Sequence, residues 1–174
     1  MRRHLRHRDP GSTVRTTARR RHGFTLIELL ITLAVLALLS TIALPLAQVE
    51  IQRTREHEFA RSLRELRRAI DEYKKAYDEG HILHRVDATG YPHRLEDLVE
   101  GIEDARDPKK RKIFFLRRIP RDPMVVDAAA GDADTWAKRS YASEASDPRE
   151  GDDVYDIRSR ATGVGLNGIA YSRW

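Results

Sequence analysis

A stretch of 21 consecutive residues without a charged side chain, Leu29 to Val49, constrains the fold of this 174-residue chain more than any other feature. As an α-helix at about 1.5 Å per residue, the stretch would be about 31 Å long, enough to cross the hydrocarbon core of a bilayer. Arg19, Arg20 and Arg21 precede it, so the positive-inside rule places the N-terminus in the cytoplasm and the residues from Glu50 onward outside. The sequence therefore predicts a single-pass membrane protein.

The basic charge of the chain is concentrated before this stretch. Residues 1–23 hold eight arginines and one acidic residue, Asp9, whereas residues 24–174 carry 24 basic and 26 acidic side chains. If residues 1–23 are a removable leader, the net charge of +5 gives no evidence for a nucleic-acid partner, and we expect none. The chain has no cysteine, which excludes disulfides, thiol chemistry and cysteine metal sites.

A second helical pattern follows the uncharged stretch without a turn signal. Its apolar residues are spaced three or four apart and form one stripe on an otherwise charged helix: Phe59, Leu63, Leu66, Ile70, Tyr73 and Tyr77. We expect one helix from Phe24 to about Glu79, which ends before Gly80 and whose second half packs through the stripe on a small antiparallel sheet. The fold class is therefore α+β. A coiled coil is the alternative for the stripe, although the pattern lasts less than three heptads.

The remaining residues predict short elements separated by proline, glycine and aspartate. A short helix is expected around Leu95 to Val99. Short strands are expected at residues 113–116, 136–141 and 154–157, and Asn167-Gly168 predicts a turn before a last strand or extended tail at residues 169–174.

Residues 21–30 read RHGFTLIELL and resemble the type III signal of prepilins and pseudopilins. The resemblance implies that a prepilin peptidase cuts after Gly23 and methylates the new N-terminal residue, Phe24. It also implies that Pro45 bends the helix, as in many pilins. The expected parts are a leader at residues 1–23, a transmembrane and filament-core helix at 24–49, and a periplasmic domain at 50–174. A twin-arginine signal and an ordinary secretory signal are alternatives, but the uncharged run is longer than their apolar segments. A true start codon downstream of Met1 is also left open.

Glu28 is an acidic residue at the start of an apolar segment. A carboxylate near the centre of a membrane span costs roughly 2.5 kcal/mol or more, so such residues are taken as functional unless a partner or snorkelling explains them. By the resemblance, Glu28 docks one subunit on the next by pairing with the methylated amine of Phe24 of a neighbour. The alternative is a carboxylate that only snorkels to the interface.

Further segments are similar, in matching order, to landmarks of the G-type major pseudopilin of type II secretion. They are Tyr91-Pro92 with residues 95–99, the run IPRDP at 119–123, and VYDIRS at 154–159. The resemblance implies a non-enzymatic subunit that forms a helical filament in the inner membrane and drives protein export. Its partners would be the peptidase, minor pseudopilins, the inner-membrane platform and the secretin.

Two other functions compete with this interpretation. A minor or competence-type pilin with a role in adhesion or DNA uptake would be favoured by an exposed basic patch, for which residues 109–112 with Arg117 and Arg118 are the candidate. An exported enzyme on a membrane anchor would need a catalytic constellation, and the sequence offers no nucleophile elbow, phosphate loop or HExxH motif.

No cofactor is expected, with one candidate left open. Family members often bind calcium in the final loop, and Asp152, Asp153 and Asp156 are the weak candidates here. The run GVGLNG at residues 163–168 matches GxGxxG but is followed by only six residues, so it predicts a glycine-rich turn and not a dinucleotide site. His81, His84 and His93 are interpreted as loop histidines because a fourth zinc ligand of suitable spacing is absent.

Overall fold

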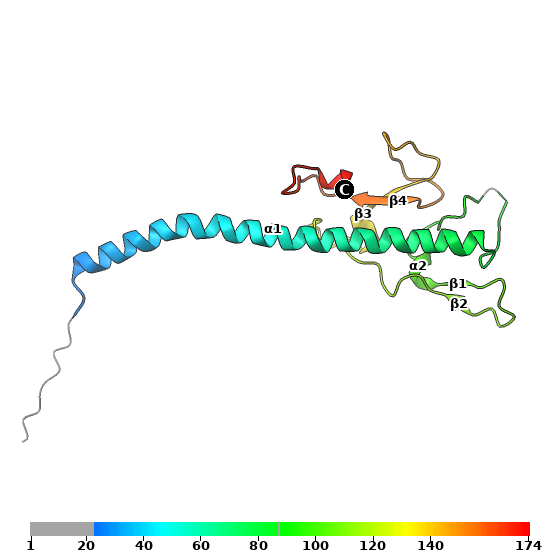
Figure 1. Ribbon diagram of the computed structural model, residues 1–174, viewed down its shortest axis with the longest axis horizontal. Helices are drawn as coiled ribbons and strands as arrows, with labels where there is room; N and C mark the ends of the chain where they lie inside the picture. The colour runs from blue at the N-terminus through cyan, green and yellow to red at the C-terminus, as the bar shows by residue number, and fades with distance from the viewer. Residues whose placement is uncertain (1–22, 87) are drawn as a thin grey trace, which may run out of the picture. The chain divides into compact units, whose positions relative to one another are not determined.

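The computed structural model describes residues 23–86 and 88–174, and the predicted leader lies outside the described residues except for Gly23. Its longest element is α1, Leu26–Asp78, and the short elements lie along the second half of this helix (Figure 1). They are α2 Asp97–Glu100, β1 Ile102–Glu103, β2 Lys112–Ile113, β3 Trp136–Arg139 and β4 Asp156–Ser159, with 3₁₀ turns at Ala133–Thr135 and Tyr171–Arg173. The chain divides into two compact units between Ala43 and Leu44, and each is described by itself.

The first unit contains the start of α1. This helix includes a segment that is long and apolar enough to span a membrane. From Leu26 to Leu39 its large apolar side chains are all at least half exposed, as expected for a surface whose solvent is lipid or other helices. α1 continues through Pro45, which has no N–H to donate to the helix ladder, and the bend expected there stays a prediction.

The C-terminal end of α1 is closed by a Schellman motif. Gly80 adopts φ +76°, its N–H donates to the carbonyl of Tyr77 (2.9 Å), and the N–H of His81 donates to the carbonyl of Ala76 (2.9 Å). A side chain is strained at this φ, so the glycine ends the helix, as the sequence predicts.

The second unit contains two small antiparallel sheets. β1 pairs with β2, and β3 pairs with β4 in a register that sets Trp136 opposite Ser159 and Arg139 opposite Asp156. The alternation along β4 buries Ile157 and Ser159, so this face of the β3–β4 sheet is turned to the core. The α+β fold class with a long N-terminal helix is thus confirmed, although the strands form two sheets instead of one.

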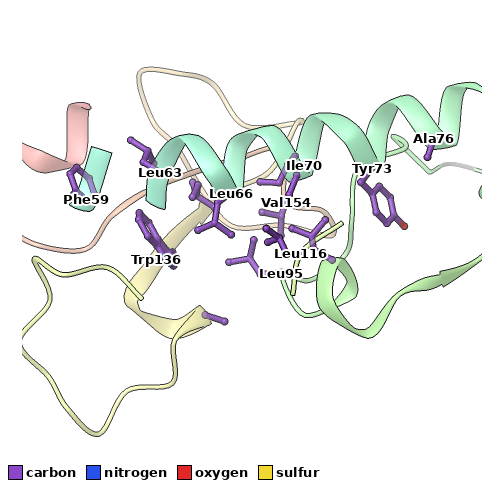
Figure 2. Close-up of a cluster of buried hydrophobic side chains, with 14 of the residues drawn as sticks. Phe59, Leu63, Leu66, Ile70, Tyr73, Ala76, Leu95, Leu116, Trp136 and Val154 are labelled. Atoms are coloured by element: carbon purple, nitrogen blue, oxygen red, sulfur yellow. The ribbon is translucent and has the colours of Figure 1, made fainter. Parts of the chain in front are cut away.

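The core of the second unit lies between α1 and these sheets. Phe59, Leu63, Leu66, Ile70 and Tyr73 of the predicted stripe are all buried. Figure 2 shows Leu66 and Ile70 on the side of α1 that is turned to Trp136, Leu95, Leu116 and Val154. Phe59 stacks on Trp136, with 5.8 Å between ring centroids. Tyr77, the last stripe residue, is only partly buried and stacks on His84 at 4.2 Å.

The short elements differ in their bounds from the sequence expectation. The strand expected at residues 136–141 ends at Arg139, and the strand expected at 154–157 forms at Asp156–Ser159. The strand expected at residues 113–116 ends at Ile113, because the N–H groups of Phe115 and Leu116 both donate to the carbonyl of Leu98. Residues 169–174 form one bridge, Val164 to Ala170, and then a 3₁₀ turn. The short helix expected around Leu95 to Val99 is α2, which begins at Asp97 and not at Leu95. At residues 114–116 and 169–174, local contacts replace the strand that residue preference indicates.

Candidate functional site

The segment before α1 has the geometry of an accessible processing site. Gly23 and Phe24 precede the helix, both are exposed, and a Cβ on Gly23 would meet no atom within 4 Å. Phe24 is 76% exposed. The residues on both sides of the predicted cleavage point are therefore accessible, and the cleavage itself stays a prediction.

Thr25 is the residue that starts the helix. Its Oγ1 accepts the backbone N–H of Glu28 (3.2 Å), and its carbonyl accepts the N–H of Leu29 (3.2 Å). Threonine followed three residues later by glutamate is the sequence signature of a capping box. The capping role was missed in the sequence, where Thr25-x-x-Glu28 was the signal for it.

Glu28 lies in the first turn of α1, surrounded along the helix by apolar side chains. The neighbouring apolar side chains are each more than half exposed: Leu26, Ile27, Leu29 and Leu30. In the described part of the chain, the Glu28 carboxylate accepts no hydrogen bond and forms no ion pair. An acid here is favourable to the helix dipole by about 0.3–1 kcal/mol. That gain is smaller than the cost of a carboxylate in an apolar surrounding, so either the predicted cationic partner or snorkelling to the interface has to offset the rest.

The comparison with known families bears on these residues. Residues 18–44 match the family model of the prokaryotic N-terminal methylation motif. This match supports a pilin-like protein with a prepilin signal, and it covers Gly23, Phe24, Glu28 and most of the uncharged stretch. No curated protein and no solved structure matches the chain.

The second unit contains a buried carboxylate that sequence reasoning missed. Glu56 is only 8% exposed. Its Oε1 accepts hydrogen bonds from the N–H of Leu166 (2.9 Å), the hydroxyl of Tyr171 (2.8 Å) and the amide of Gln52 (3.0 Å). Glu56 therefore joins α1 to the glycine-rich turn and the 3₁₀ turn more than 100 residues away. The sequence signal that could have found it is its position, since Glu56 lies three residues before Phe59 and continues the three-and-four spacing of the buried stripe.

The environment of Glu56 makes stability depend on pH. Burial raises the pKa of Glu56, but the hydrogen bonds from Leu166, Tyr171 and Gln52 outweigh burial and hold the pKa below its ordinary value of 4.5. A carboxyl group with a lowered folded-state pKa stabilises the fold above its unfolded pKa, and the contribution is lost as the pH falls through the folded value.

We therefore expect a fragment of residues 50–174 to lose stability as the pH falls below about 4.5. Glu56→Gln should lower the free energy of unfolding at pH 7 by about 1–2 kcal/mol, because hydrogen bonds to a charged acceptor are stronger than those to an amide. The variant should also show a weaker acid dependence. Urea unfolding at several pH values measures both, with the exposed Glu58→Gln as control. Equal behaviour of the two variants would contradict the assigned role.

Two of the three calcium candidates already have other partners. Asp153 is buried and accepts hydrogen bonds from the Thr89 hydroxyl and the Tyr141 N–H, and Asp156 forms an ion pair with Arg67 (2.8 Å). Asp152 is exposed. Among residues 23–86 and 88–174, no three His, Cys, Asp or Glu side chains gather closely enough to hold a metal ion. Asp153 and Asp156 thus already have partners, and calcium binding stays a prediction.

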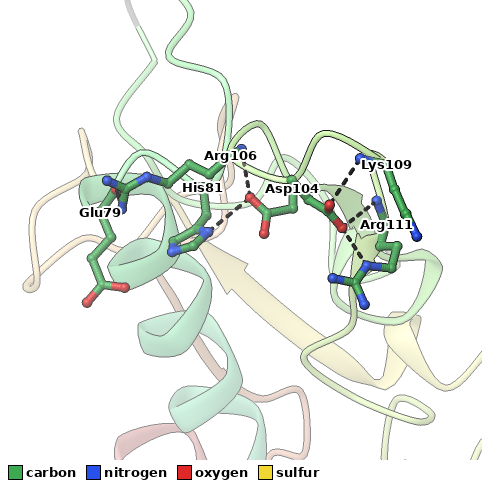
Figure 3. A network of polar contacts seen from close by, with 7 residues as sticks. Glu79, His81, Asp104, Arg106, Lys109 and Arg111 are labelled. Carbon is green, nitrogen blue, oxygen red and sulfur yellow. Dashed lines mark hydrogen bonds and ion pairs between the residues drawn. The ribbon is translucent and has the colours of Figure 1, made fainter.

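The loop histidines and the basic run have structural contacts. His81 Nδ1 lies 2.9 Å from the carboxylate of Asp104, which also accepts the N–H of Arg106 (Figure 3). The guanidinium of Arg106 donates to the carbonyl of Glu79 at the end of α1 (3.1 Å). Hydrogen bonds from Arg106 and His81 lower the pKa of Asp104. The network holds the β1–β2 hairpin on the end of α1 and leaves no reason to assign His81 to zinc.

The run GVGLNG forms a turn, as the sequence predicts. The N–H of Gly168 donates to the carbonyl of Gly165, and the N–H of Gly165 donates to the carbonyl of Ile169. A 3₁₀ turn follows, with no βαβ unit around it. The turn instead delivers the Leu166 N–H to Glu56.

Proposed function

We propose that this chain is a structural subunit of a type II secretion pseudopilus, a G-type major pseudopilin that assembles in the inner membrane into a helical filament and drives protein export across the outer membrane. The observation that carries the proposal is the methylation motif, which continues directly into an apolar helix with Glu28 in its first turn. In such a filament the apolar helices bundle at the axis and the α+β units form the outer shell. The work of assembly would come from a separate ATPase.

The choice of a secretion-type subunit rests on the landmark segments. Three segments far apart in the sequence are joined by hydrogen bonds: the Val154 N–H donates to the carbonyl of Pro92 (2.7 Å), and the Ser159 hydroxyl donates to the carboxylate of Asp122 (2.5 Å). Pro92 and Asp122 are fully buried. These contacts support the landmarks as parts of one packing arrangement, which gives the resemblance a physical basis. The absence of cysteine also favours secretion-type relatives over adhesive pili.

The proposal predicts the mature N-terminus. In cells with active prepilin peptidase, the membrane-extracted protein should begin at Phe24 and carry one methyl group on its amine. Intact-mass spectrometry measures this directly, and a peptidase-deficient strain is the control. A mature protein that retains residues 1–23, or one that starts after Ala47 as an ordinary secretory signal would produce, would contradict the assigned cleavage.

A competence-type pilin is the second candidate, and one observation favours it. Five arginines and two glutamates line one groove of about 830 Å³ between α1 and the segment after β2: Arg61, Arg64, Arg68, Arg117, Arg118, Glu65 and Glu72. Arg68 pairs with Glu72 (3.0 Å), so the groove keeps an excess of positive charge. Such a groove attracts anions, and a DNA duplex bound there would show strongly salt-dependent affinity. The slight excess of acidic residues in 24–174 argues for the secretion subunit. Neighbouring genes for a secretin and a secretion ATPase would separate the two candidates.

A further inference from the structure

Four arginines line a cavity on the outer side of the β3–β4 sheet, which we call the arginine cavity. They are Arg67 of α1, Arg139 of β3, Arg158 of β4 and Arg173 of the last 3₁₀ turn, and the cavity measures about 250 Å³. At about 30 Å³ per liquid water, this volume has room for about eight waters, or for a tetrahedral oxyanion with a few waters around it.

The strand register places two of these arginines on one face. Ala137 is opposite Arg158, and Arg139 is opposite Asp156. Residues two apart on a strand share a face, so Arg139, Asp156 and Arg158 lie together on the face away from the buried Ile157 and Ser159. The strand register therefore makes this face of the β3–β4 hairpin basic.

Two carboxylates line the cavity, the side chain of Asp156 and the terminal carboxylate of Trp174, and Arg67 contacts both. Arg67 Nε donates to Asp156 Oδ1 (2.8 Å), and its Nη2 donates to the carbonyl of Ile157 (3.2 Å) and to a terminal oxygen of Trp174 (3.0 Å). Four guanidinium groups thus face two carboxylates, so the lining of the cavity keeps an excess of positive charge.

The guanidinium groups of Arg139, Arg158 and Arg173 have few partners in the described part of the chain. Arg139 contacts the ring of Tyr155 at 4.8 Å, but its side chain makes no hydrogen bond or ion pair there. Arg158 donates one long hydrogen bond, 3.4 Å, to the carbonyl of Pro148. The Nε atoms of Arg139 and Arg158 are both buried without a partner. Leaving a charged donor unpaired away from water is costly, which indicates that an acceptor is missing.

The chemistry of that acceptor follows from the donors. Guanidinium groups form paired hydrogen bonds with planar or tetrahedral oxyanions, and several of them can share one phosphate because each of its oxygens accepts more than one bond. A phosphate monoester or inorganic phosphate carries up to two negative charges, whereas a carboxylate carries one. The cavity volume of about 250 Å³ is enough for a terminal phosphate with a few waters.

We propose that the arginine cavity is a binding site for a phosphate dianion, supplied as free phosphate or as the phosphomonoester head group of a lipid. Full-length protein in maltoside micelles is titrated with inorganic phosphate at constant ionic strength, against chloride, and its melting temperature is followed. A parallel titration uses micelles that contain phosphatidic acid. Saturable stabilisation by inorganic phosphate identifies the free source, and saturable stabilisation only by phosphatidic acid identifies the lipid source.

Variants of the lining arginines test whether phosphate binds in the arginine cavity. Arg139→Gln and Arg173→Gln should each weaken phosphate binding about tenfold or more, because each removes a charge-assisted donor. Arg160→Gln is the matched control, since Arg160 lies next to β4, is exposed and pairs with Glu150 outside the cavity. If Arg139→Gln does not fold, Arg173→Gln alone tests the site. The exposed Arg173 side chain makes no described hydrogen bond or ion pair, so its replacement should leave the fold intact. No saturation with either ligand, or equal binding by all variants, would overturn the proposal.

Discussion

Leu66→Asp is expected to unfold the second unit. Leu66 is fully buried where α1 meets Trp136, Leu95 and Leu116, and no described cation lies in this cluster. An aspartate there would either bury an unpaired charge or leave a cavity, and the two effects together should cost about 4 kcal/mol or more. The free energy of unfolding of a domain this size is roughly 5–15 kcal/mol in total, so little or no folded protein should remain.

The measurement is urea or thermal unfolding of a fragment of residues 50–174, followed by circular dichroism. Glu65→Asp is the matched control, because it introduces the same residue one position away on the exposed side of α1 and should cost under about 1 kcal/mol. Leu66→Met, which keeps the volume, should cost less than about 1.5 kcal/mol. If Leu66→Asp melts like Glu65→Asp, the core face assigned to α1 is wrong.

The parts of the fold that follow from periodicity could be predicted from the sequence. The three-and-four spacing from Phe59 to Tyr73 selects one face of α1, and the structure buries that face. Gly80 marks the end of α1 because few other residues adopt its φ. The membrane span before Glu50 could be predicted without tertiary information, because the length of the uncharged run matches the thickness of a bilayer.

The parts that depend on long-range contacts could not be predicted. Helical spacing places Glu56 on the stripe face, but its hydrogen-bond donors Leu166 and Tyr171 come from more than 100 residues away, so its role as a buried acceptor could not be predicted. β1 is two residues long and carries no alternation that a sequence pattern could detect. The arginine cavity arises from the register of β3 with β4, which pairs residues 17 to 23 positions apart along the chain.

Glu28→Leu is expected to leave the subunit in the membrane and stop its assembly. Removing the charge makes the span more apolar, so insertion should not suffer. In the filament, the charged amine of Phe24 from the next subunit would lose its carboxylate partner, and breaking a buried ion pair from one side typically costs about 3–5 kcal/mol. Such a loss is roughly a hundredfold or more in the equilibrium for adding a subunit.

Glu28→Gln separates this docking role from the local role in the helix. The amide keeps the size of the side chain, and the Thr25 cap uses only the backbone N–H of residue 28, so the start of α1 should persist. The lost interaction with the helix dipole is worth only about 0.3–1 kcal/mol. A defect as large as that of Glu28→Leu would therefore come from the intersubunit charge pair and not from the helix.

The most direct test is the fraction of processed subunit recovered as filament from sheared or cross-linked cells. The wild type is compared with Glu28→Leu, Glu28→Gln and the control Glu50→Gln, whose exposed carboxylate contacts only Arg53 in the described part of the chain. Normal membrane levels of methylated subunit with little or no filament for both Glu28 variants, and normal filament for Glu50→Gln, are the predicted result. Filament yields from both Glu28 variants equal to the wild type would contradict docking through Glu28.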